Sequence, residues 1–392
     1  MAVVRSRFWL LGAAALLLML ALSACSGGPT EPSWGQIGLL DNNVLFTFSH
    51  TLVQLNPVDG SAVGAHLSDG TPRTTTDSEG RSTNQAVSWA ITAPNAIRFY
   101  QTPLILDEST LLAPSYDRKF FYIDRMSAIF NDTTGIDIPG HIVGNILRDG
   151  DVLYVPLSEA DLLALNVSDL SQIWRFTTER GVWSQPLLNE GILYVTAMDH
   201  HLYAVDAATG NEIWRLDLGG AVAATPLLYN NYLYVGTFGR KIYKISLDGQ
   251  VAAEYTTADW VWGTPVVADD TLYAADLVGN VYALSLTGDG FTEIWRRQVA
   301  SRQIRPSPVV IGDRLAVGSS DHFVYWLNRT DGSTIISRDV QGEVEAEMLL
   351  VQPSEQLQIG EPLLLVSTMN TANLLYAFPA DGNSEPRWKY PR

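Results

Sequence analysis

The tripeptide Asp199-His200-His201 places two imidazoles beside a carboxylate, a set of groups that can bind zinc. Neighbouring residues of a strand point to opposite faces, so two adjacent histidines rarely share one metal ion. The corresponding segment of a later repeat reads Asp321-His322 and lacks the second histidine. We therefore expect a turn at both places and no metal site.

Other signatures of catalysis are missing from the sequence. The chain has no phosphate-binding loop, no His-Glu-x-x-His and no Gly-x-Ser-x-Gly motif. Thr287-Gly288-Asp289-Gly290 lacks the later carboxylates of a calcium loop, so it is expected to be a hairpin turn. The formal net charge of −17 disfavours a nucleic-acid partner, since binding to phosphates needs basic patches.

Cys25 is the only cysteine and follows a hydrophobic N-terminal run. Arg5 and Arg7 precede the run Phe8 to Leu22, which is shorter than the about 20 residues of a membrane-spanning helix and typical of a signal peptide. Leu22-Ser23-Ala24-Cys25 resembles the bacterial lipobox, which implies cleavage before Cys25 and acylation of its sulfur. We predict a signal peptide over 1–24, a lipid-anchored tether over 25–32, and a location outside the cytoplasm. In a two-membrane cell this is the periplasmic face of the outer membrane, and otherwise the outer face of the plasma membrane.

A repeat of about 40 residues fills the rest of the chain. Its copies alternate apolar and polar residues with period two and are separated by turn residues, as antiparallel strands require. One slot holds Tyr154, Tyr194, Tyr234 and Tyr273, and its counterparts are Ala316 and Leu365 towards the C-terminus and Leu112 and Phe46 towards the N-terminus. These eight units predict an all-β fold over 33–392, an eight-bladed β-propeller of four-stranded antiparallel blades.

Two insertions lengthen the regular spacing. The polar segment 68–85 is expected to be a mobile surface loop, and a second insertion lies near 352–361. The last unit supplies its own outer strand around Trp388-Lys389-Tyr390, so little or no strand exchange with Trp34 is expected. We expect a monomeric propeller.

The repeat resembles the pyrroloquinoline-quinone-type (PQQ-like) β-propeller family, most clearly from Leu193-Tyr194-Val195 to Trp214. The resemblance implies that the outer-strand Trp174, Trp214 and Trp295 dock between blades, with Tyr255 at the missing place in their series. It also raises a quinone-dependent dehydrogenase as an alternative function. Those enzymes use adjacent cysteines, which this chain lacks, so we expect no catalytic residues and no quinone cofactor.

Several traits together resemble the lipoprotein B family of outer-membrane β-barrel assembly, whose members are lipobox-bearing eight-bladed propellers. The resemblance implies a non-enzymatic scaffold that binds a subunit of the assembly machine through an Arg-Gly before the fourth blade. Arg180-Gly181 occupies that place, whereas Phe176-Thr177-Thr178-Glu179 departs from the leucine-rich approach of the family. A propeller that binds another envelope protein, a glycan or a small ligand is the alternative.

A second repeated slot marks the inner strand of the blades. Proline recurs there, and the residue three before it varies and is often large. Because innermost strands line the channel, these variable residues should ring one channel mouth. Tryptophan, tyrosine and arginine dominate binding hot spots, whereas packing within the channel is the alternative explanation. The predicted partner-binding residues are Tyr100, Arg180, Trp183, Trp260, Trp262, Arg302 and Arg305.

Overall fold

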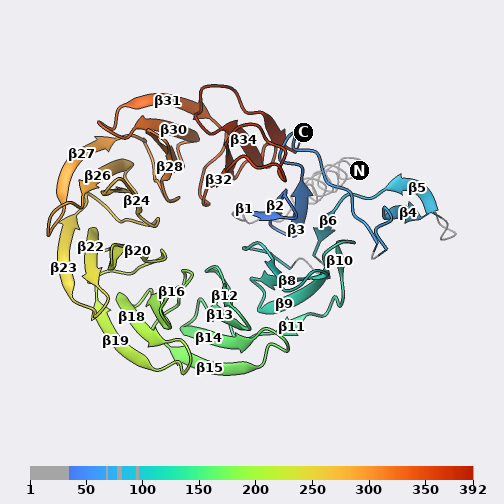
Figure 1. Cartoon of the computed structure of the whole chain (residues 1–392), viewed down its shortest axis with the longest axis horizontal. Helices are drawn as coiled ribbons and strands as arrows, with labels where there is room; N and C mark the ends of the chain where they lie inside the picture. The colour runs from blue at the N-terminus through green and yellow to red at the C-terminus, as the bar shows by residue number, and fades with distance from the viewer. Residues whose placement is uncertain (1–34, 68, 77–81, 94–96, 392) are drawn as a thin grey trace, which may run out of the picture. The chain divides into compact units, whose positions relative to one another are not determined.

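Eight antiparallel sheets succeed one another around a central axis in the computed structural model of this chain (Figure 1). The structure describes residues 35–67, 69–76, 82–93 and 97–391. Cys25, Trp34 and the predicted signal peptide and tether therefore lie outside the described residues. Within the described part there is no helix long and apolar enough to cross a membrane.

The first two blades carry the irregularities of the fold. Blade 1 is formed by β1 (Gln36–Leu40), β2 (Asn43–Phe48), β3 (Thr51–Leu55) and β6 (Ala90–Thr92). Blade 2 is formed by β7 (Leu104–Ile105), β8 (Thr110–Ser115), β9 (Lys119–Asp124), β10 (Ile129–Phe130) and β11 (Ile136–Asp137), of which the last two both pair with β9.

Blades 3 to 8 each contain four consecutive strands in sequence order. They are β12 (Leu147–Asp149), β13 (Val152–Pro156), β14 (Asp161–Asn166) and β15 (Gln172–Thr177) in blade 3; β16 (Leu187–Asn189), β17 (Ile192–Thr196), β18 (His201–Asp206) and β19 (Glu212–Asp217) in blade 4; β20 (Leu227–Tyr229), β21 (Tyr232–Gly236), β22 (Lys241–Ser246) and β23 (Val251–Thr256) in blade 5; β24 (Val266–Ala268), β25 (Thr271–Ala275), β26 (Asn280–Ser285) and β27 (Thr292–Gln298) in blade 6; β28 (Val309–Ile311), β29 (Arg314–Gly318), β30 (Phe323–Asn328) and β31 (Thr334–Asp339) in blade 7; and β32 (Leu349–Val351), β33 (Leu363–Ser367), β34 (Leu375–Pro379) and β35 (Trp388–Tyr390) in blade 8.

Tight turns join the first and second strands of the blades. Asn230 and Asn231 both have positive φ, of 48° and 61°, as the two-residue turn of a β-hairpin requires. Asp269 and Asp270 repeat this conformation in blade 6, and short polar side chains tolerate it best. The turn residues thus set the register that buries the repeated Tyr slot on the second strand, from Tyr154 through Tyr273.

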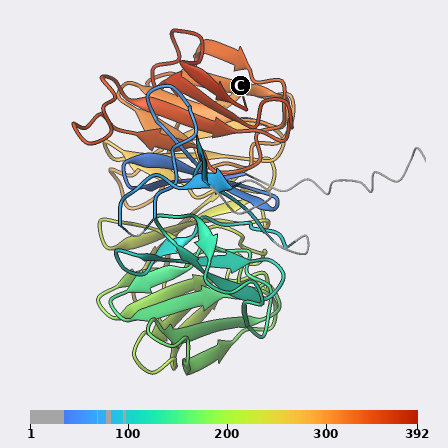
Figure 2. The same ribbon diagram turned by 90° about the vertical axis from the view of Figure 1, so that its right-hand side faces the viewer.

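The hydrophobic core lies between neighbouring blades. One cluster joins Tyr154 and Trp174 of blade 3 to Leu193 and Tyr203 of blade 4, and comparable clusters fill the other blade interfaces. Seen from the side, the sheets of successive blades lie next to each other (Figure 2). Each blade therefore depends on its neighbours, which explains why the repeat has to close into a ring.

Tryptophans on the outer strands of blades 3, 4 and 6 fasten these blades to the next, as the resemblance implied. The indole nitrogens of Trp174, Trp214 and Trp295 donate to carbonyls of the following blade, at 3.0, 3.0 and 2.9 Å. Trp174 packs on Gly210, where φ is +73° and a Cβ atom would lie 2.6 Å from the indole ring. A glycine is required there by both the backbone conformation and the close approach.

The place assigned to Tyr255 in this series is wrong. Tyr255 pairs with Ile242, and the residue in register with the tryptophans is Ala253, opposite Lys244. Lys244 is buried and extends its ammonium group to the carbonyls of Gly288 and Asp289, at 3.4 and 3.5 Å. Lys244 is on the third strand of blade 5, and in blade 7 the docking side chain likewise comes from the third strand. There the indole of Trp326 donates to the Ala380 carbonyl at 2.8 Å.

Within the described residues, the ring closes through side chains and without strand exchange. β1 pairs with β2 and β35 pairs with β34, which confirms the prediction that the last unit supplies its own outer strand. Trp388 donates to the Pro57 carbonyl at 2.8 Å, and the Ser367 hydroxyl donates to the Gly35 carbonyl at 2.7 Å. The seam between blades 8 and 1 thus uses the same kind of indole contact as Trp174, Trp214 and Trp295 make.

The segment predicted as a mobile loop contains strands of its own. In this segment β4 (Thr74–Thr76) pairs with β5 (Ser82–Ala86) in a separate two-stranded sheet, which ends one residue beyond the predicted loop. Residues 68 and 77–81 lie outside the described residues. The second predicted insertion is confirmed as the connection between β32 and β33.

Candidate protein-binding rim

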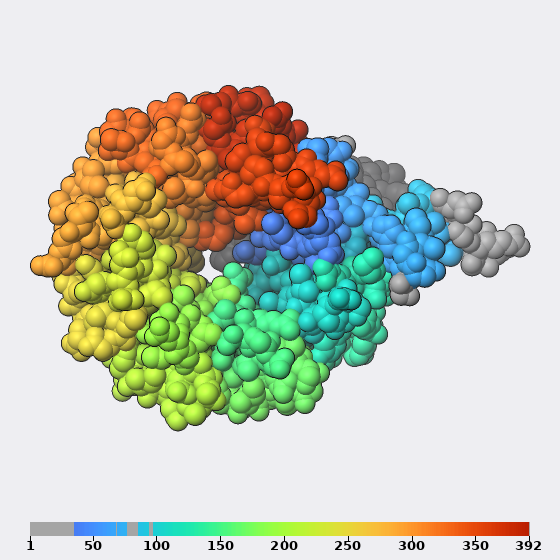
Figure 3. Space-filling model, viewed as in Figure 1, coloured from blue at the N-terminus to red at the C-terminus, as the bar shows by residue number. Residues whose placement is uncertain are grey.

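The variable residues of the inner-strand slot converge on the central opening that Figure 3 shows. Proline precedes the inner strand directly in five blades, and the slot residue three positions before it lies in the connection from the outer strand of the previous blade. Six of the slot residues line one cavity of about 220 Å³: Val143, Trp183, Ala223, Trp262, Arg305 and Glu345. Tyr100 is not part of this lining and lies against Tyr116, with 5.0 Å between ring centroids.

Five side chains form one continuous stack along the rim. Trp260 lies parallel to Phe238 at 4.9 Å between centroids, and the other contact of Phe238 is Trp262 at 5.1 Å. The Arg305 guanidinium lies 4.8 Å from the Trp262 ring and forms an ion pair with Glu345 at 2.8 Å. Trp262 and Arg305 are therefore engaged within the protein, while Trp260 ends the stack with 45% of its surface exposed.

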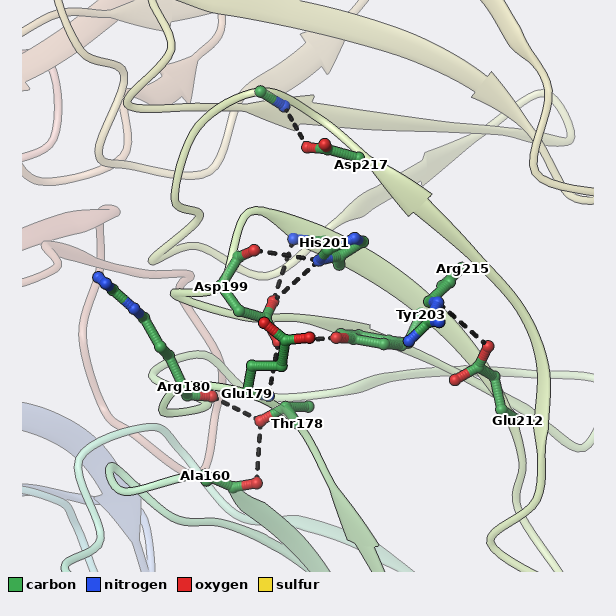
Figure 4. Close-up of polar contacts among 11 residues, drawn as sticks. Ala160, Thr178, Glu179, Arg180, Asp199, His201, Tyr203, Glu212, Arg215 and Asp217 are labelled. Carbon is green, nitrogen blue, oxygen red and sulfur yellow. Dashed lines mark hydrogen bonds and ion pairs between the residues drawn. The ribbon is translucent and has the colours of Figure 1, made fainter.

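The loop before blade 4 presents Arg180 to solvent (Figure 4). The buried carboxylate of Asp199 accepts hydrogen bonds from the Glu179 amide at 2.9 Å and from the Tyr203 hydroxyl at 2.7 Å. Thr178 donates to the Ala160 carbonyl at 2.9 Å and ties the other side of the loop to blade 3. The backbone beneath Arg180 is thus fixed, whereas its guanidinium has no hydrogen-bond or ion-pair partner among the described residues.

The Asp199-His200-His201 segment is a structural turn. His200 has a φ of 78°, and so does His322 of the Asp321-His322 segment. Burial and the hydrogen bond to Asp199 raise the pKa of Tyr203, so the hydroxyl stays protonated and donates to the carboxylate. Asp321 repeats this contact with Tyr325 at 2.8 Å. No cluster of three potential metal ligands occurs in the described ranges of the chain.

A belt of hydrogen bonds below the rim was not predicted from the sequence. Thr225 donates to the Gln185 carbonyl at 3.0 Å, and Thr264 donates to the Thr225 carbonyl at 3.1 Å. Ser307 donates through its hydroxyl and its amide to Glu347, both at 2.9 Å. The residue before the proline slot is polar in every one of these blades, which is the signal that could have revealed the belt.

Glu347 is the carboxylate of this belt and faces the channel. Solvent reaches it through the channel, yet protein atoms surround it, and this desolvation raises its pKa. The two hydrogen bonds from Ser307 act in the opposite direction and are the weaker influence. Arg302, the remaining predicted residue, is exposed and forms an ion pair with Glu343 at 3.3 Å.

Comparisons with known proteins agree with this architecture. The model of one family, described as outer membrane protein assembly factor BamB, matches residues 136–338. BamB of Salmonella typhimurium is 29% identical over 89 residues, which are 23% of this chain and 21% of that protein. The alignment thus spans about a fifth of the relative's length.

Solved structures match over most of the chain. The crystal structure of BamB from Moraxella catarrhalis has a TM-score of 0.61 at 17% identity, covering 85% of this chain and 91% of that one. The computationally designed Ika8 protein has a TM-score of 0.62 at 12% identity, covering 89% and 98%. Sqt1 of Saccharomyces cerevisiae has a TM-score of 0.66 at 10% identity, covering 89% and 96%. At these identities the likeness is one of fold.

Proposed function

Because this chain belongs to the family of outer membrane protein assembly factor BamB, we propose that it is a non-enzymatic scaffold of the cell envelope. In this role it binds a protein of the machinery that assembles outer-membrane proteins. Acyl chains on Cys25 hold it at the periplasmic face of the outer membrane, since more than one chain gives stable anchoring. The propeller acts as a monomer, which the closure of its ring within one chain supports.

The Arg180 loop is the observation that carries this proposal. It precedes blade 4, where the family resemblance puts the contact with the assembly machine. Its guanidinium is exposed and has no partner within the described part of the chain, while Asp199 holds the backbone below it. An arginine of this kind can form a bidentate pair with a carboxylate of another protein without first breaking an internal contact.

The absence of a catalytic role rests on the chain's own chemistry. A quinone-dependent dehydrogenase of the PQQ-like type uses adjacent cysteines, and this sequence has a single cysteine. The channel side chains are occupied with one another, as Arg305 pairs with Glu345 and Ser307 with Glu347. Such a channel supports a structural role, and no quinone or metal cofactor is part of the proposal.

The proposal is tested by depletion in the native bacterium. Depletion should lower the amount of folded β-barrel proteins in the outer membrane, as measured by heat-modifiable mobility on gels. The intact chain should restore them, Arg180→Ala should restore them less well, and Arg296→Ala, a perimeter control on β27, should behave as the intact chain. Unchanged barrel proteins on depletion, or a single-membrane envelope, would contradict the proposed function.

A further inference from the structure

The exposed end of the rim stack forms an apolar platform on blades 5 and 6. Trp260 belongs to the loop between β23 and β24, Phe238 to the turn between β21 and β22, and Val278 to the turn between β25 and β26. Trp260 is 45% exposed and Val278 is 44% exposed. A hydrogen bond of 3.0 Å from the Leu277 amide to the Trp260 carbonyl joins the Trp260 loop to the Val278 turn.

Hydrogen bonds and ring stacking hold this platform in place. The Trp260 amide donates to the Asp259 carboxylate at 2.8 Å, and the Phe238 amide donates to the Ala221 carbonyl at 2.9 Å. The Trp260 and Phe238 rings are within 8° of parallel, and Phe238 rests in turn on Trp262. A partner that covers the outer face of Trp260 would therefore gain apolar contact at little cost in side-chain entropy.

The charge beside the platform is positive and unpaired. Arg240 follows Phe238 by two residues in the same turn and is exposed. Its guanidinium has no hydrogen-bond or ion-pair partner in the part of the chain that the structure describes. The nearest carboxylate in sequence to Trp260, that of Asp259, already accepts the Trp260 amide. The complementary partner thus combines an apolar side chain with a negative charge.

We infer that Phe238, Trp260, Val278 and Arg240 form a docking platform for a polypeptide segment of a partner protein. The segment places an aromatic or large aliphatic side chain on Trp260 and a carboxylate against Arg240. The inference rests on the proposed scaffold function and adds a second contact surface, which lies on different blades from the Arg180 loop. Aromatic and arginine side chains that act together in this way are typical of binding hot spots.

Two synthetic peptides test the platform on the purified propeller. One alternates phenylalanine with glutamate, and the other alternates phenylalanine with lysine; binding is followed by tryptophan fluorescence and by NMR of the indole N–H groups. The acidic peptide should bind more tightly than the basic one and shift the Trp260 indole signal. Trp260→Ala should weaken this binding about thirtyfold, as expected for a hot-spot residue.

Charge reversal gives a test that does not alter the aromatic stack. Arg240→Glu should weaken the acidic peptide about tenfold and improve the basic peptide. Ile213→Ala and Arg296→Glu, both at exposed positions of the outer strands, serve as matched controls and should leave both affinities unchanged. Equal binding of the two peptides, or binding that Trp260→Ala leaves intact, would overturn the inference.

The outcomes separate this inference from the proposed function. If Arg180→Ala impairs barrel assembly while neither platform variant affects peptide binding, the platform is wrong and the scaffold function stands. If the platform variants lose the acidic peptide while depletion leaves barrel assembly unchanged, the platform stands and the assembly role is wrong.

Discussion

Trp388→Ala is expected to lower the free energy of unfolding by about 4 kcal/mol, because the residue fastens the seam at which blade 8 meets blade 1. Trp388 is 6% exposed, donates to the Pro57 carbonyl at 2.8 Å and packs on Gly60. Truncation of a buried tryptophan to alanine costs about 3 to 5 kcal/mol in transfer and cavity free energy. Trp388→Phe should keep most of the packing and lower the free energy of unfolding by about 1 kcal/mol, because the hydrogen bond to the Pro57 carbonyl is lost.

Urea unfolding followed by tryptophan fluorescence and by circular dichroism measures these differences. Ile213→Ala, which truncates a half-exposed side chain on β19, provides the control and should cost less than 1 kcal/mol. A loss below 1 kcal/mol for Trp388→Ala would show that the seam does not depend on this indole, and the account of ring closure would then be wrong.

Three further predictions concern the channel, the rim loop and the anchor. Desolvation by the surrounding protein raises the pKa of Glu347, so the folded protein holds this proton to higher pH than the unfolded chain, and the free energy of unfolding falls as the pH rises through that window. Glu347→Gln should therefore gain stability relative to the parent between pH 4 and pH 8 in urea titrations, and an equal difference between the two proteins at both pH values would refute this. Asp199→Ala should lower the free energy of unfolding by roughly 2 to 3 kcal/mol, because the Tyr203 hydroxyl and the Glu179 amide lose their acceptor. The loop should then loosen, so trypsin should cleave after Arg180 faster in this variant than in an Asp217→Ala control. Cys25→Ser should release the protein from the membrane fraction, and unchanged fractionation would contradict acylation at this residue.

The repeated slots of the sequence predict the blades because each slot depends on the strands and turns of its own repeat. The Tyr slot is buried on the second strand of each blade, and short polar turns fix its register. The outer strands are harder to predict, because turn length varies between blades. The turn between β22 and β23 is one residue shorter than the turn between β18 and β19, so the position in register with Trp214 is Ala253 and not Tyr255.

The rim could be located from the sequence, but its internal contacts could not. Variation of residue type in a regular frame indicated Trp183, Trp262 and Arg305, and these do line the channel. The stack of Trp262 between Phe238 and Arg305 joins residues from three connections of the ring. Pairing of this kind depends on the rotation between blades, which no local pattern encodes. It leaves Trp260 and Arg180, rather than Trp262 and Arg305, as the rim residues open to a partner.

Site-specific photocrosslinking from position 180 in the native bacterium tests the scaffold function most directly. A photoreactive amino acid in place of Arg180 should capture a protein of the outer-membrane assembly machinery, whereas the same group in place of Ile213 on the perimeter should not. Mass spectrometry of the crosslinked band identifies the captured protein. Capture of the same proteins from both positions, or capture from position 180 of proteins unrelated to barrel assembly, would contradict the account.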